Sequence, residues 1–72
     1  MERLTRIELN DYCENAGLTQ LQKDILRLKY FDDRDLTVVA ICIELNISKS
    51  KYHINHNKLL SQIYKYEYLK KK

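Results

Sequence analysis

Residues 37–59 read TVVAICIELNISKSKYHINHNKL, and the organisation of the whole chain follows from this segment. Four of its apolar residues recur at the spacing of one helix face: Val38, Ile41, Cys42 and Leu45. Thr37 precedes them as an N-cap, and Asn46 follows as a residue that tolerates the left-handed backbone of a tight turn. The β-branched run 38–43 also fits a buried strand, but the cap and the turn favour a short helix.

A longer helix is predicted directly after the turn. Ile47 packs the turn against the core, and Ser48 is the N-cap of the new helix. The apolar stripe then recurs at spacings of four, three, four and three residues: Tyr52, His56, Leu59, Ile63 and Tyr66. This helix should be the longest element and should fade in the lysine tail at 70–72.

The residues before this segment predict two further helices. The first runs from about Thr5 to Ala16, and Gly17 is its C-cap. The second has Thr19 as its N-cap and ends near Tyr30, before a polar loop. The apolar stripes are Leu9, Tyr12, Cys13 and Ala16 in the first helix and Leu18, Leu21, Ile25 and Leu28 in the second.

The predicted fold class is therefore all-α, with four helices in a single domain. We divide residues 1–72 into an N-terminal helix at 1–17, a core at 18–66 and a basic tail at 67–72. A chain of 72 residues buries only about 60% of the surface that it exposes when unfolded, which leaves little room for an enzyme-like cleft. With 44% hydrophobic residues, one Gly and no Pro, the composition suits neither a disordered segment nor a turn-rich sheet.

The two cysteines, Cys13 and Cys42, lie within helical patterns and no secretory signal precedes them. We expect a reducing, cytoplasmic location, buried thiols and no zinc site, because no Cys/His spacing fits one. No run approaches the roughly 20 apolar residues that span a bilayer, so no membrane partner is expected. We also expect no cofactor and no enzymatic activity, because no nucleophile, base and orienting group stand at a suitable spacing. We interpret the acidic residues of the 32–35 loop as solvated charges.

Charge is unevenly distributed along the chain. Residues 1–45 hold nine acidic and six basic side chains, whereas residues 46–72 hold seven lysines and one acid. No acid lies between Glu44 and Glu67. Such a segment fits a surface that faces a polyanion, and a solvated helix face with a lysine tail is the alternative.

Two helices joined by a short turn, the second one rich in lysine and amide side chains, form the layout of a helix-turn-helix. With Tyr52 in the core, the opposite face of the second helix carries Ser50, His53, Ile54, Asn57 and Ser61. His56 lies on the buried stripe as a boundary residue, and no metal site pairs it with His53. We therefore predict sequence-specific binding of double-stranded DNA by a small transcription regulator.

The segment from Leu18 to Ile63 also resembles region four of bacterial sigma factors. The resemblance rests on ILRLKY at 25–30, Leu36 and Thr37, and NISK at 46–49, followed by a leucine pair at 59–60. Related short modules occur in phage-encoded transcription regulators. After the capping Ser or Thr, sigma factors typically have Arg-Glu-Arg-Val-Arg-Gln, which falls here on Lys49, Ser50, Lys51, Tyr52, His53 and Ile54. Two basic positions keep their charge as Lys49 and Lys51. The acid that contacts DNA bases is replaced by Ser50, the arginine by His53 and the glutamine by Ile54. The resemblance therefore implies a different DNA target.

The predicted DNA-binding residues are Thr37, Ser48, Lys49, Ser50, Lys51, His53, Ile54, Asn57 and Lys58. The three lysines among them would contact phosphates, and the two capping residues would place helix N-termini near the DNA backbone. Ser50 and Asn57 can hydrogen-bond base edges, which weakly favours an A/T-rich site. Ile54 fits either a thymine methyl contact or a helix-helix contact.

Apolar residues that lie outside the predicted core stripes suggest protein partners. The candidate surfaces are Leu4 with Ile7, Val39 with Ile43, and Tyr64 with Tyr68. A lone helix-turn-helix of this size makes few contacts, so a homodimer or association with RNA polymerase is expected. The alternative function is a protein-interaction module of the same fold that binds RNA polymerase or another regulator without contacting DNA.

Overall fold

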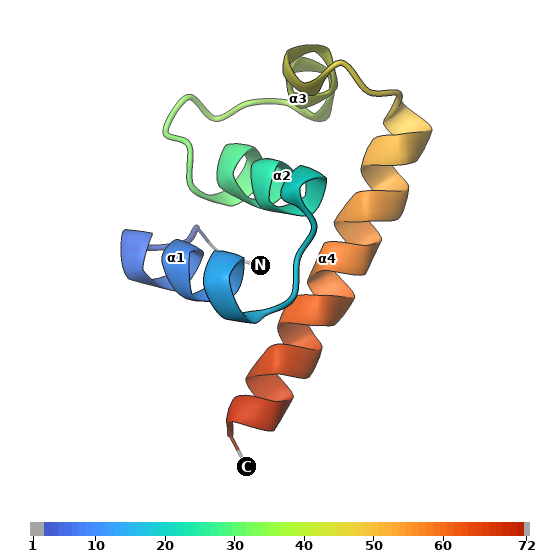
Figure 1. Cartoon of the computed structure of the whole chain (residues 1–72). Coiled ribbons are helices and arrows are strands. Elements are labelled where there is room, and N and C mark those ends of the chain that lie inside the picture. Colours follow the sequence, from blue (N-terminus) through green and yellow to red (C-terminus); the bar gives the residue numbers. More distant parts are fainter. Residues whose placement is uncertain (1–2, 72) are drawn as a thin grey trace.

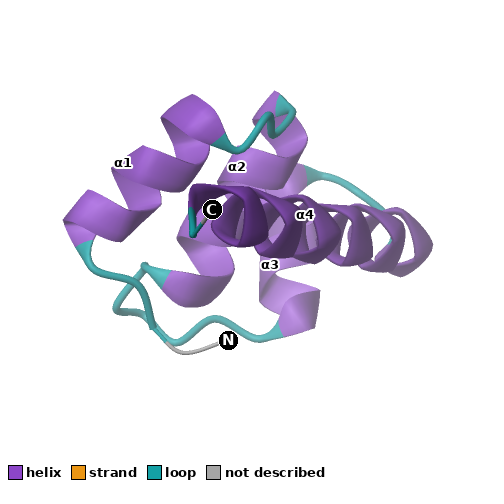
Figure 2. Ribbon diagram, turned by 90° about the horizontal axis from the view of Figure 1, so that it is seen from below, coloured by secondary structure: helices purple, strands orange, loops and turns teal. Residues whose placement is uncertain are grey.

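A computed structural model describes residues 3–71, which form four helices and no strand. The helices are α1 (Arg6–Asn15), α2 (Gln20–Tyr30), α3 (Val38–Leu45) and α4 (Lys49–Lys70). In Figure 1, α1 and α2 lie one above the other, α3 lies beyond α2, and α4 runs along one side of all three. Figure 2, seen from the end of α4, shows short loops between the helices. The predicted all-α class with four helices is confirmed.

Each helix begins at a hydroxyl side chain that accepts a backbone N–H. Thr5 accepts from Glu8, Thr19 from Gln22, Thr37 from Ala40 and Ser48 from Lys51, at oxygen-nitrogen distances of 3.1–3.2 Å. In α1 and α2 the side chain of the third helical residue accepts the backbone N–H of the cap residue, which completes a capping box. These caps explain why four helices start where the sequence indicates.

The core lies where α2 meets α3 and α4. Its fully buried side chains are Ile25, Leu26, Leu28, Ile41, Tyr52, Leu59 and Ile63. Leu4 joins this core from the segment before α1, and its backbone N–H donates to the Tyr30 carbonyl at 2.8 Å. We had predicted that Leu4 and Ile7 form a partner surface, but Leu4 is a core residue and only Ile7, 83% exposed, is available to a partner.

Helix α4 ends at Lys70, where the sequence analysis predicted that it fades, and it includes the first residues of the segment that we had set apart as a tail. We expected a basic tail at 67–72, but the helix continues through Glu67 and ends at Lys70. Polar contacts with α1 hold these last turns: the Tyr12 hydroxyl donates to Glu67 at 2.6 Å, and Lys70 Nζ lies 3.0 Å from Asp11. Lys72 lies outside the described residues. No described helix combines the length and apolar character needed to cross a membrane.

Candidate nucleic-acid interface

The first half of α4 presents one face to solvent and the other to the core. Tyr52 and Leu59 are 2% and 0% exposed, respectively, which fixes the rotation of the helix about its axis. The side chains predicted to point outward are all exposed: Ser50, His53, Ile54, Asn57 and Ser61. The predicted orientation of α4 is therefore confirmed.

A three-residue turn sets the direction of α4 relative to α3. Asn46 has φ 57° and ψ 49°, the left-handed conformation expected of it. The Ile47 N–H donates to the Cys42 carbonyl at 3.0 Å, and the Cys42 thiol lies 3.9 Å from the Ser48 carbonyl oxygen. Because these contacts link the end of α3 to the start of α4, the exposed face of α4 is held in a fixed orientation.

Three lysines in the first half of α4 carry uncompensated charge. Lys49, Lys51 and Lys58 are exposed, and no ion pair within residues 3–71 involves them. The acid closest in sequence, Glu44, instead lies 3.1 Å from Arg34. Three exposed lysines within about two and a half turns, without a carboxylate paired to them, make the first half of α4 electropositive.

The same arginine also binds an acid of the preceding loop. Its hydrogen bonds lower the pKa of Asp32 to about 2, so this carboxylate is ionised but compensated. Asp32 and Glu44 are thereby both paired with Arg34 and not with a lysine of α4.

The two histidines occupy different environments. His53 is exposed, and its ring contacts the edge of Tyr52 at a centroid distance of 5.3 Å. His56 is stacked between Tyr30 and Tyr52, at 5.8 and 5.5 Å, and its Nε2 lies 2.6 Å from the Tyr30 hydroxyl. Burial, followed by the charge of Lys29, lowers the pKa of His56. His53 alone is therefore placed to contact a ligand, and the described residues contain no cluster of metal-binding side chains.

Thr37 is exposed at the start of α3, at the opposite end of that helix from the turn. Eight residues of helix separate it from Asn46, a distance of about 12 Å. Ser48 therefore lies at the start of α4 beside Lys49, whereas Thr37 lies at a separate helix end.

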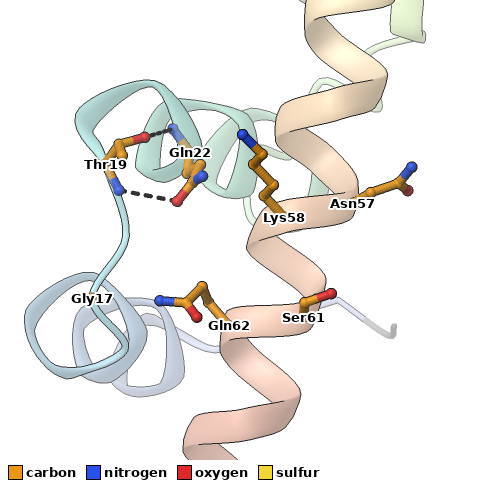
Figure 3. A pocket seen from close by; sticks show the side chains of 7 residues that line it. All are labelled: Gly17, Thr19, Gln22, Asn57, Lys58, Ser61 and Gln62. Carbon is orange, nitrogen blue, oxygen red and sulfur yellow. Dashed lines mark hydrogen bonds between the residues drawn. The ribbon is translucent and has the colours of Figure 1, made fainter.

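An open groove between the start of α2 and the middle of α4 was not predicted from the sequence. Figure 3 shows its lining, which includes the N-cap Thr19, Gln22 of α2 and Asn57, Lys58 and Ser61 of α4. We call it the α2–α4 groove. Gln22 is 6% exposed, and the sequence signal for its position was the capping-box spacing Thr-x-x-Gln at 19–22.

A second open groove lies on the outer side of α3 and is bordered by Lys49. Its apolar lining includes Val39 and Ile43, which are 48% and 75% exposed. The prediction that these residues lie off the core is confirmed.

No family model, curated protein or solved structure matches the chain.

Proposed function

We propose that the chain binds double-stranded DNA through a helix-turn-helix formed by α3, the turn at 46–48 and α4, and that it acts as a small transcription regulator. The observation that carries this proposal is the exposed, acid-free face of α4, which begins immediately after the left-handed turn at Asn46. The resemblance to sigma factor region four supports the same arrangement.

The dimensions and chemistry of this face suit the major groove. That groove admits one α-helix, and its base edges offer hydrogen-bond donors and acceptors. Ser50, His53 and Asn57 supply hydroxyl, imidazole and amide groups on the exposed face. Ile54 is 55% exposed, which favours a thymine methyl contact over a helix-helix contact within the chain.

The lysines would supply the part of the binding affinity that does not depend on the DNA sequence. Each phosphate neutralised releases counterions, so log K falls with log salt by about 0.9 per contact on duplex DNA. Lys49, Lys51 and Lys58 together therefore account for a slope of about 2.7.

A salt titration of duplex binding tests the proposal. Fluorescence anisotropy with a duplex selected from a random pool should give the steep slope, and replacing one of the three lysines by glutamine should lower it by about 0.9. An absence of duplex binding at low salt contradicts the proposal.

A second candidate function is a protein-interaction module that binds RNA polymerase or another regulator without contacting DNA. The apolar groove on α3, with Val39 and Ile43 exposed beside Lys49, favours it. The triple variant with Lys49, Lys51 and Asn57 replaced by Ala separates the two candidates. Regulation of purified polymerase that survives this change supports the second candidate, and loss of regulation together with DNA binding supports the first.

A further inference from the structure

Helix α1 carries the most exposed large apolar side chain among residues 3–71. Ile7 is 83% exposed and lies in the first turn of the helix. Asp11 and Glu14 follow it at positions i+4 and i+7, so the three side chains share one helix face. Together with Glu8 and Lys70 they line one open surface, which we call the α1 patch.

The α1 patch is acidic. Lys70 lies 3.0 Å from Asp11 and compensates that carboxylate. Arg6, the other cation of α1, lies over an aromatic ring at 5.6 Å from its centroid. Glu8 and Glu14 are exposed and form no ion pair within the described part of the chain. The α1 patch therefore places an exposed apolar side chain beside two uncompensated negative charges.

The groove on the outer side of α3, which we call the α3 groove, has the complementary character. Val39 and Ile43, one helical turn apart, provide its exposed apolar surface. Its charged lining residue is Lys49, which has no ion pair among the residues that the structure describes. The carboxylate closest to it in sequence, Glu44, is already paired with Arg34 at 3.1 Å. An apolar side chain with a negative charge beside it therefore matches both the surface and the charge of the α3 groove.

The two surfaces belong to helices that lie on opposite sides of α2 (Figure 1). They therefore cannot cover each other within one chain, whereas the α1 patch of one copy can reach the α3 groove of another. A symmetric contact between two α1 patches would place Glu8 and Glu14 opposite the same acids, and like charges across an interface repel each other. Charge complementarity thus favours a head-to-tail contact, in which unlike surfaces meet.

We propose that the chain associates with a second copy of itself head to tail. Ile7 of one copy enters the α3 groove of the other and contacts Val39 and Ile43, while the acids of the α1 patch face Lys49. The inference goes beyond the proposed function, since this contact involves no DNA. Because the two contacting surfaces differ, further copies can add in the same way. The contact centres on one apolar side chain, so it should bury less than the roughly 800 Å² per partner of a standard interface and should be weak.

Sedimentation equilibrium of the chain without DNA, from about 10 µM to about 1 mM, tests the proposal. We expect the weight-average mass to rise above the 8.7 kDa of one chain as the concentration increases. The rise should be smaller at about 0.5 M salt, because salt screens the attraction between the acids and the lysine. A mass that stays at 8.7 kDa throughout overturns the proposal and leaves the DNA-binding proposal unaffected.

Two variants locate the contact. Ile7→Ser removes the side chain that enters the groove, and Ile43→Ser removes apolar surface that receives it. Both residues are exposed, so both variants should fold, which circular dichroism checks. Each should weaken association about 10- to 100-fold, the effect of no longer burying one aliphatic side chain. The matched control is Leu69→Ser, which removes an aliphatic side chain that is 57% exposed on α4 and lines neither surface. This control should associate like the parent chain, and an equal loss in Leu69→Ser and Ile7→Ser overturns the proposal.

A mixture of the two defective variants tests the head-to-tail order. The Ile7→Ser chain keeps an intact α3 groove and the Ile43→Ser chain keeps an intact α1 patch, so one contact can still form between them. At a concentration where neither variant associates alone, the equimolar mixture should contain heterodimers. A mixture that remains monomeric there, although the parent chain associates, overturns the head-to-tail contact.

Discussion

Replacing Tyr52 with Phe should stabilise the protein, although Tyr52 is among the most deeply buried side chains. Its ring is 2% exposed, and its hydroxyl has no hydrogen-bond partner among residues 3–71. Leaving a polar group buried and unpaired costs about 1–3 kcal/mol, whereas Phe keeps the ring and removes the oxygen. After a small loss of packing around the missing atom, we expect a net gain of about 1 kcal/mol.

The matched control is Tyr12→Phe, which removes the same atom from a tyrosine with a partner. The Tyr12 hydroxyl donates to Glu67 at 2.6 Å, and burial together with this bond raises the pKa of Tyr12. Losing a hydrogen bond to a charged group costs about 1.5–3 kcal/mol, so this variant should be less stable than the parent chain.

Thermal and urea denaturation followed by circular dichroism at 222 nm measure both changes. For a domain of this size, 1 kcal/mol corresponds to about 4–8 °C in Tm. Tyr52→Phe should melt higher than the parent chain and Tyr12→Phe lower. A Tyr52→Phe variant that melts below the parent chain would refute the argument, since it would mean that the hydroxyl has a partner in solution.

Three further outcomes follow from the same structure. Asn46→Ala should cost about 1–2 kcal/mol in urea denaturation because of the left-handed backbone, whereas Asn46→Gly should cost much less. Leu59→Ala should cost about 2–5 kcal/mol, a large part of the total of about 4–11 kcal/mol expected for 72 residues. Burial lowers the pKa of His56 below the usual 6.5, so near this pH the unfolded chain takes up a proton that the folded chain does not. The contribution of His56 to the free energy of unfolding should therefore be constant above about pH 7 and fall as the pH drops below 6.5. His56→Gln should flatten that decline between pH 7 and 5, and an equally steep decline in the variant would contradict this assignment.

Local chemistry predicted most of the fold. The predicted caps Thr19, Thr37 and Ser48 each accept the expected backbone N–H, and Asn46 adopts the expected left-handed conformation. These features depend on neighbours within four residues, so the order of side chains along the chain is enough to specify them. The exposed side of α4 was predictable for the same reason, because one buried residue fixes the orientation of the others.

Features that depend on distant residues could not be predicted in this way. The contact of Tyr12 with Glu67 joins residues 55 positions apart, and it holds the last turns of α4 against α1. Asp35 also has a positive φ of 54°, in a loop that showed only a polar composition. The α2–α4 groove required two helices to be placed side by side, which periodicity within either one does not specify.

The carboxylate of Asp11 has a consequence for the order of folding. It accepts from the Tyr66 hydroxyl at 2.7 Å, from Lys70 at 3.0 Å and from Asn15 at 2.9 Å. Two of these three bonds close loops of more than fifty residues, so their entropic cost is high until the intervening helices have assembled. The docking of α1 on the last turns of α4 should therefore be a late event in folding and an early one in unfolding. Native-state hydrogen exchange should find α1 opening locally while the amides of α2 remain protected.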